Sequence, residues 1–143
     1  MVESQISEGA AEASTRTSTQ SRQTNIMELA QNYDNFLFDC DGVLWSAESQ
    51  IGTAFETLEE LERMGKKVFF ITNNATKLTE DMAAKMTRMG YNNIKLNQIY
   101  TTGALVSKYI RRKYPDIRKV FAIGVQSIRK SLESEGIEVI GAD

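Results

Sequence analysis

The 143-residue sequence contains no histidine, one cysteine and one proline. Without histidine, neither an imidazole base nor a histidine-ligated metal can operate within this chain. Cys40 has no cysteine to pair with and no secretory signal is recognisable, so we expect a reducing, cytoplasmic location. No apolar run reaches membrane-spanning length, and 17 basic against 19 acidic residues give no general attraction for nucleic acid or anionic lipid. The remaining chemistry is that of carboxylates, hydroxyls, amides and lysine.

The first segment, residues 1–24, is rich in Ser, Thr, Gln, Glu and Ala and has almost no large apolar side chains. Because such a composition buries too little apolar surface to offset the entropy of ordering, we expect a disordered leader. An organellar transit peptide is the weaker interpretation, since transit peptides are poor in acidic residues and this segment contains Glu3, Glu8 and Glu12.

Beyond the leader, short apolar segments alternate with amphipathic ones. Gly65 and Gly90 end two of the helical patterns, and Thr79 is a candidate N-cap. The alternation predicts the α/β class, with a parallel, Rossmann-like sheet flanked by helices. The continuously apolar first strand predicts burial on both of its faces. We expect strands at 36–40, 68–71, 99–101, 119–124 and 137–140, and helices at 53–65, 78–90, 103–114 and 126–136.

Two of the predicted strands end in polar residues. Asp39 and Asp41 follow the first strand, and Thr72 and Asn73 follow the second. In open α/β sheets the carboxyl ends of adjacent strands share a ligand site. Two carboxylates with a hydroxyl and an amide can hold Mg²⁺ and a phosphate together, and one carboxylate can attack while the other transfers protons. Gly42 permits a tight turn after the pair. The plainer interpretation is a surface turn with solvated aspartates.

The segment FDCDGVLW, followed by a helix and then VFFITNNAT, resembles the haloacid dehalogenase (HAD) superfamily of phosphatases. The extension GVLW resembles the branch that contains 4-nitrophenylphosphatases, phosphoglycolate phosphatases and pyridoxal phosphate phosphatase. The resemblance covers approximately residues 33–143.

This resemblance assigns a role to each polar residue. Asp39 would be the nucleophile and a Mg²⁺ ligand, while Asp41 would be the general acid/base and would lend its backbone carbonyl to the metal. Thr72 would bind the phosphoryl group, with Asn73 and the backbone of Gly42 helping to orient it.

The resemblance also predicts how the chain is divided. Residues 25–115 would form the amino-terminal part of the HAD core, residues 116–143 the start of a C2-type α/β cap, and residues 42–51 a mobile turn beside the site. Family members carry a later catalytic lysine and an acidic Gly-Asp motif, and we find no counterpart, since Lys66, Lys67 and Lys77 lack the right context. We therefore expect an incomplete core with uncovered apolar strand faces.

The functional hypothesis is a Mg²⁺-dependent phosphomonoester hydrolase that acts through an aspartyl-phosphate on a small phosphorylated metabolite or an aryl phosphate. Phosphoglycolate, pyridoxal phosphate and protein phosphotyrosine all stay open as substrates. The alternative is a catalytically inert fragment or short isoform that acts through binding, with a homodimer formed through the partial cap. A phosphotransferase or mutase is a third hypothesis. We expect no nucleic-acid or membrane partner.

Two smaller features have structural interpretations. Cys40 lies between the two aspartates, whose charges raise a thiol pKa, so packing is favoured over redox chemistry. The basic run at 108–114 predicts a solvated helix face, with Val106, Tyr109 and Ile110 on the other face of the same helix.

Overall fold

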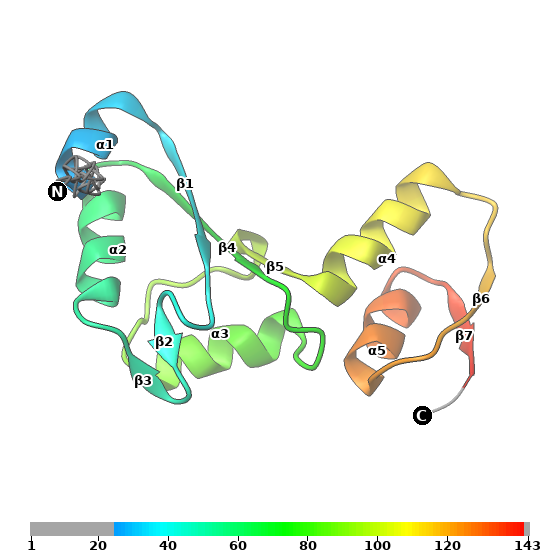
Figure 1. Ribbon diagram of the computed structural model, residues 1–143. Helices are drawn as coiled ribbons and strands as arrows, with labels where there is room; N and C mark the ends of the chain where they lie inside the picture. The colour runs from blue at the N-terminus through cyan, green and yellow to red at the C-terminus, as the bar shows by residue number, and fades with distance from the viewer. Residues whose placement is uncertain (1–24, 142–143) are drawn as a thin grey trace, which may run out of the picture.

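The computed structural model describes residues 25–141, so the prediction for the leader at 1–24 lies outside the described residues. Three parallel strands form the main sheet, in the order β1-β4-β5 (Figure 1). This arrangement confirms the predicted α/β class. The elements of this part are α1 (Ile26–Asn32), β1 (Asn35–Asp39), α2 (Ala54–Arg63), β4 (Lys67–Thr72), α3 (Thr79–Arg88), the 3-10 turn η1 (Leu96–Gln98) and β5 (Ile99–Thr101).

The remaining elements follow β5 in the chain and lie to the right of the main sheet in Figure 1. They are α4 (Thr102–Lys113), β6 (Lys119–Phe121), α5 (Gln126–Ser134) and β7 (Glu138–Ile140), with β6 and β7 paired in parallel. Helix α4 packs closely on α5 at Gly103. A Cβ added to this glycine would lie only 2.8 Å from Ser131 Oγ. The hydroxyl of Ser127 on α5 donates to the carbonyl of Ala75, which ties this part of the chain to the loop after β4.

Four of the observed elements were not predicted, among them the 3-10 turn η1 before β5. Helix α1 precedes the first strand, and a short antiparallel hairpin, β2 (Trp45–Ser46) with β3 (Ser49–Gln50), occupies the segment expected to be a mobile turn. Ala47 turns this hairpin with a positive φ of 52°. Two-residue strands leave too little alternation for a sequence pattern to detect.

The main sheet buries only one of its two faces within residues 25–141. Phe36 and Phe70 point into the core and are buried, whereas Leu37 is 62% exposed and Ile71 is 38% exposed. Burial of β1 on both faces is therefore wrong for the described part of the chain, because α1, α2 and α3 all contribute to one core cluster. The expectation of uncovered apolar strand faces matches this second face.

Helix α2 forms where apolar spacing and a terminal glycine predicted it, whereas the N-cap of α3 differs from the prediction. In α2, Leu58 and Leu61 lie three residues apart and are both buried, and Gly65 ends the turn with a φ of 76°. In α3 the N-cap is Leu78 and not Thr79. Asp81 displaces the predicted cap, since its carboxylate accepts the Leu78 amide at 3.1 Å.

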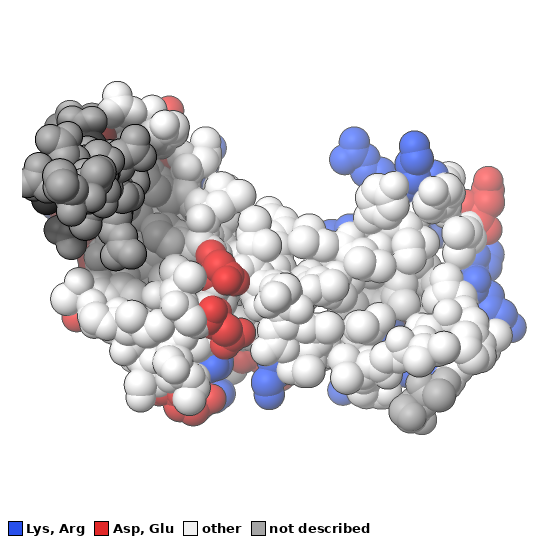
Figure 2. All heavy atoms as spheres, in the orientation of Figure 1, with Lys and Arg blue, Asp and Glu red and all other residues white. Residues whose placement is uncertain are grey.

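Helix α4 turns a small-residue face to the rest of the molecule. Gly103 and Ser107 are buried, whereas Val106 is 43% exposed and Tyr109 is 58% exposed. The basic residues of its last turn lie at the surface, where Figure 2 shows Lys and Arg side chains at the far end of the helix. The boundary predicted between residues 115 and 116 stays a prediction. None of the helices within residues 25–141 is long and apolar enough to cross a bilayer.

The buried face of α2 gives a stability prediction. Leu58→Ala should lower the free energy of unfolding by about 2–5 kcal/mol, because Leu58 is fully buried and its removal leaves a cavity. Leu105→Ala, on the 43% exposed Leu105 of α4, is the matched control and should change it by less than about 0.5 kcal/mol. Urea unfolding followed by circular dichroism measures both, and equal effects would contradict the assignment of this core.

Candidate active site

The two predicted polar clusters meet at the carboxyl edge of the main sheet. β1 pairs directly with β4, and in this register Asp39 lies opposite Ile71, the residue before Thr72. Thr72 in turn lies opposite Thr101 of β5. The pairing of β1 with β4 therefore brings Asp39 and Thr72 to adjacent strand ends, as the sequence predicted if the two strands were neighbours.

Asp39 is the exposed last residue of β1 and directly follows three apolar residues. Its Oδ1 accepts the amide of Cys40 at 2.8 Å, which holds the carboxylate in one orientation. Within the described part of the chain this is the only hydrogen bond that the Asp39 side chain makes. The second oxygen is therefore open to a ligand.

The backbone after Asp39 folds into a tight turn around one carbonyl. Cys40 O accepts the amides of residues 43, 44 and 45 at 2.9–3.4 Å. Gly42 takes a φ of 81°, a conformation that glycine adopts readily, and its amide donates to Trp45 O at 2.8 Å. Because that amide is already engaged, phosphate contact through Gly42 would require this bond to open, and the predicted role of Gly42 stays a prediction.

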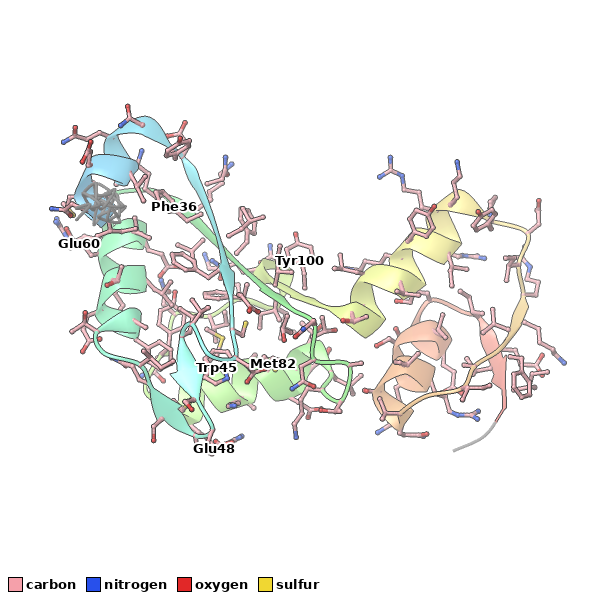
Figure 3. All side chains as sticks on the ribbon, viewed as in Figure 1. Phe36, Trp45, Glu48, Glu60, Met82 and Tyr100 are labelled. Carbon is pink, nitrogen blue, oxygen red and sulfur yellow. The ribbon has the colours of Figure 1, made fainter. Side chains whose placement is uncertain are left out.

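Asp41 is held by side chains from two different elements. The indole Nε1–H of Trp45 donates to Asp41 Oδ1 at 2.7 Å, and Lys85 Nζ of α3 lies 3.8 Å from the same oxygen. The Lys85 ammonium also lies 5.0 Å from the centroid of the Trp45 ring, a cation–π arrangement. Figure 3 shows Trp45 between the hairpin and α3, with Glu48 at the tip of the hairpin.

The residues at the end of β4 differ in how available they are. Thr72 is only 2% exposed, and its Oγ1 accepts the Asn74 amide at 3.0 Å, so its own proton is free to donate. Asn73 is exposed, whereas the Asn74 side-chain oxygen is occupied by the amide and hydroxyl of Thr76. Thr72 and Asn73 therefore remain the candidates for binding an anion.

A pocket of about 230 Å³ opens beside Asp41 and is walled mainly by α3. Its charged lining has both signs, which matches the acidic and basic side chains that Figure 2 shows together near the hairpin. The charged residues that line it are Asp41, Glu48, Lys77, Asp81, Lys85 and Arg88.

Cys40 is a packing residue, as the sequence indicated. Its side chain is fully buried, and burial, followed by the charges of Asp39 and Asp41, raises the pKa of the thiol to about 12, against a smaller opposing effect of Lys85. A thiol of this kind is almost entirely protonated at neutral pH and is a poor nucleophile. The Cys40 thiol is therefore poorly suited to be the attacking group of this site.

The donor set fits Mg²⁺ held jointly with a substrate. Within residues 25–141 no three His, Cys, Asp or Glu side chains are grouped to hold a metal ion, so Asp39 and Asp41 stand as a pair. Mg²⁺ in phosphoryl-transfer sites commonly takes one or two carboxylates and completes its shell with water and substrate oxygens. The exposed carboxylate of Asp39 meets that requirement.

Sequence reasoning missed Lys85 and the hydrogen bond of Trp45. One signal for Lys85 was available: it lies three residues after Met82 and one before Met86, both buried, so a cation interrupts the apolar face of α3. A lysine in that position needs a specific partner. Its partner, Asp41, is 44 residues earlier in the chain, and no local pattern connects the two.

The buried thiol gives a chemical prediction. With a pKa of about 12, only about one Cys40 thiol in ten thousand is ionised at pH 8, and burial blocks access as well. The folded chain should therefore not react with a disulfide reagent such as dithionitrobenzoate, whereas the chain unfolded in urea should release one equivalent. Rapid reaction of the folded chain would contradict the burial of Cys40.

Comparison with known proteins identifies similar chains. The 4-nitrophenylphosphatase of Schizosaccharomyces pombe is 36% identical over 80% of this chain and 39% of its own length. Phosphoglycolate phosphatase 2 of Arabidopsis thaliana is 32% identical over 82% of this chain and 40% of its own length. The chain therefore spans about two fifths of the length of these curated relatives.

A solved structure shows the same fold at lower identity. The glycerol phosphate phosphatase of Mycobacterium tuberculosis, in complex with magnesium, matches with a TM-score of 0.68 and 20% identity over 78% of this chain and 33% of its own. The family model described as haloacid dehalogenase-like hydrolase matches residues 36–138, which include both strand ends of the site. The chain belongs to the haloacid dehalogenase-like hydrolases.

Proposed function

We propose that this chain carries the nucleophile of a Mg²⁺-dependent phosphomonoester hydrolase, with Asp39 as the attacking group. The observation that supports this most directly is the pairing of β1 with β4, which brings the strand ends that carry Asp39 and Thr72 to the same edge of the sheet. The relatives named 4-nitrophenylphosphatase and phosphoglycolate phosphatase support the same reaction class.

In the proposed reaction Asp39 and Asp41 divide the work. An oxygen of Asp39 forms a bond to phosphorus while the bond from phosphorus to the ester oxygen breaks, and Asp41 gives its proton to the departing alkoxide. The resulting aspartyl-phosphate is hydrolysed when water attacks phosphorus, Asp41 takes the proton of that water, and Asp39 leaves with its electron pair. Phosphate and the free carboxylate are regenerated.

The other residues of the site bind and orient the ester. The Thr72 hydroxyl would donate to a phosphoryl oxygen and Asn73 would help to orient the same group. The Asp39 carboxylate and the backbone carbonyl of Asp41 would hold Mg²⁺, which supplies charge neutralisation when bound and so lets a carboxylate approach a phosphate dianion.

The finer assignments belong to the same proposal. The substrate is a small phosphorylated metabolite or an aryl phosphate, and the protein acts in the cytoplasm. Residues 25–115 form the amino-terminal part of the hydrolase core and residues 116–143 the beginning of its cap. The close packing of Gly103 on Ser131 supports a cap that sits directly on α4.

The nucleophile is tested by Asp39→Asn, which keeps the side-chain shape and removes the attacking charge. We expect hydrolysis of 4-nitrophenyl phosphate with Mg²⁺ to fall by about 10³-fold or more, because the displacement step then has no carboxylate to carry it out. Asp34→Asn is the matched control, since Asp34 is exposed, pairs with Lys66 at 3.0 Å and lies before the other end of β1.

The assay uses both the 143-residue chain and any longer form of the protein found in cells. In whichever form is active, acid quenching during turnover should trap a phosphorylated chain that hydroxylamine cleaves. Undiminished turnover by Asp39→Asn would overturn the assignment of Asp39 as the nucleophile. Trapping of the phosphoryl group on a residue other than Asp39 would overturn it as well.

The role of Thr72 is tested by a pair of substitutions. Thr72→Val keeps the shape of this buried side chain but removes the hydroxyl, and it should lower kcat/KM by about 10–100-fold, the value of a hydrogen bond to a charged group. Thr72→Ser keeps the hydroxyl and should retain most of the activity. Equal losses in both variants would indicate a packing role for Thr72 and no contact with phosphate.

A further inference from the structure

The pocket beside Asp41 contains a nearly buried cation that the proposed reaction does not use. The side chain of Lys85 on α3 is only 14% exposed. Its Nζ lies 3.8 Å from Asp41 Oδ1, 3.9 Å from Glu48 Oε1 and 5.0 Å from the centroid of the Trp45 ring. An ammonium group removed from water is stable only where other groups replace its hydration. These three groups are the replacements that the structure provides.

The Trp45 indole and the Lys85 ammonium converge on one oxygen of Asp41. Oδ1 accepts the Trp45 indole at 2.7 Å and faces the Lys85 ammonium, while Oδ2 has no hydrogen-bond partner within residues 25–141. One hydrogen bond and one ion pair on the same oxygen restrict rotation of the carboxylate and leave the other oxygen available to a ligand. The side chain of Asp41 is 46% exposed, so that oxygen can be reached.

The same cation also connects the hairpin to α3. Glu48 lies at the turn between β2 and β3, and its carboxylate faces both Lys85 and Arg88 at 3.9 Å. The hairpin carries Trp45, whose indole holds Asp41 (Figure 3). Lys85 therefore contacts Asp41 directly and also the hairpin whose tryptophan fixes it.

We propose that Lys85 is a positioning residue, which acts with Trp45 to hold Asp41 in the orientation from which it transfers protons. This inference rests on the proposed function, because proton transfer by Asp41 is part of that proposal. In this role Lys85 acts through Asp41 and is not itself a catalytic residue.

Proton transfer to the departing group matters only for some esters. An alkyl phosphate such as glycerol phosphate expels a strongly basic alkoxide, which needs the proton, whereas 4-nitrophenolate departs without one. The parameter kcat/KM reports the steps up to departure of that group and excludes the later hydrolysis of the aspartyl-phosphate. A displaced Asp41 should therefore lower kcat/KM much more for the alkyl ester than for the aryl ester.

The kinetic test compares Lys85→Met with the conservative Lys85→Arg. We expect Lys85→Met to lower kcat/KM for glycerol phosphate about tenfold or more beyond any loss for 4-nitrophenyl phosphate, since a positioned acid contributes about 10²–10⁴-fold. Lys85→Arg keeps the positive charge, so the ratio of kcat/KM for the two esters should stay close to that of the unsubstituted protein. Lys77→Met is the matched control, because Lys77 lines the same pocket but is exposed and forms no ion pair with Asp41.

A second measurement requires no turnover. Trp45 is the only tryptophan of the chain, so ¹⁵N labelling of the indole gives a single ¹H–¹⁵N side-chain signal that reports the bond to Asp41. We expect Lys85→Met to shift this signal and to accelerate exchange of its proton with solvent, and Lys77→Met to change neither. Should Lys85→Met fail to fold, Lys85→Gln supplies the same two measurements, and Trp45→Phe, which removes the indole donor, supplies the kinetic one.

The two proposals fail in different ways. Activity that survives Asp39→Asn would overturn the proposed function, and the indole signal would still decide whether Lys85 holds Trp45 and Asp41 in place. Loss of activity in Asp39→Asn, combined with equal effects of Lys85→Met on both esters and an unchanged indole signal, would overturn the positioning role alone. A selective loss for the alkyl ester together with a shifted indole signal supports both.

Discussion

The parallel pairing of β1 with β4 is the constraint on which the site depends. It places Asp39 opposite Ile71 and so brings the ends of two strands that are more than 30 residues apart in sequence to one edge of the sheet. The pairing is stabilised by Phe36, Val68 and Phe70, which are buried under the helices. The polar residues at the strand ends contribute little to that core, and the core determines where they lie.

The second aspartate depends on a different set of contacts. The turn after Asp39 closes on the carbonyl of Cys40, and this turn carries Trp45 into the core, where it is fully buried. Burial of an indole requires a partner for its N–H, and Asp41 provides one at 2.7 Å. The aromatic anchor of the hairpin and the orientation of Asp41 are therefore one structural feature, to which α3 adds the cation of Lys85.

Several elements were predictable because their patterns are local. Helix α2 repeats apolar residues at helical spacing and ends at a glycine, and β4 is a continuous apolar run. The hairpin was not predictable, since two strands of two residues each have no detectable period. The N-cap of α3 was assigned one residue too late, because a carboxylate three residues into the helix captured the Leu78 amide.

The sequence by itself determined the α/β class, the alternation of elements and the candidate residues Asp39, Asp41, Thr72 and Asn73, because each follows from local order along the chain. Only the tertiary structure decided which face of the sheet is exposed, that the Gly42 amide is already bonded, and that Lys85 reaches Asp41. These features depend on which segments pack together. Asp41 and Lys85 are 44 positions apart and meet because the segments that carry them pack on a shared apolar core. No pattern in the intervening sequence indicates that contact.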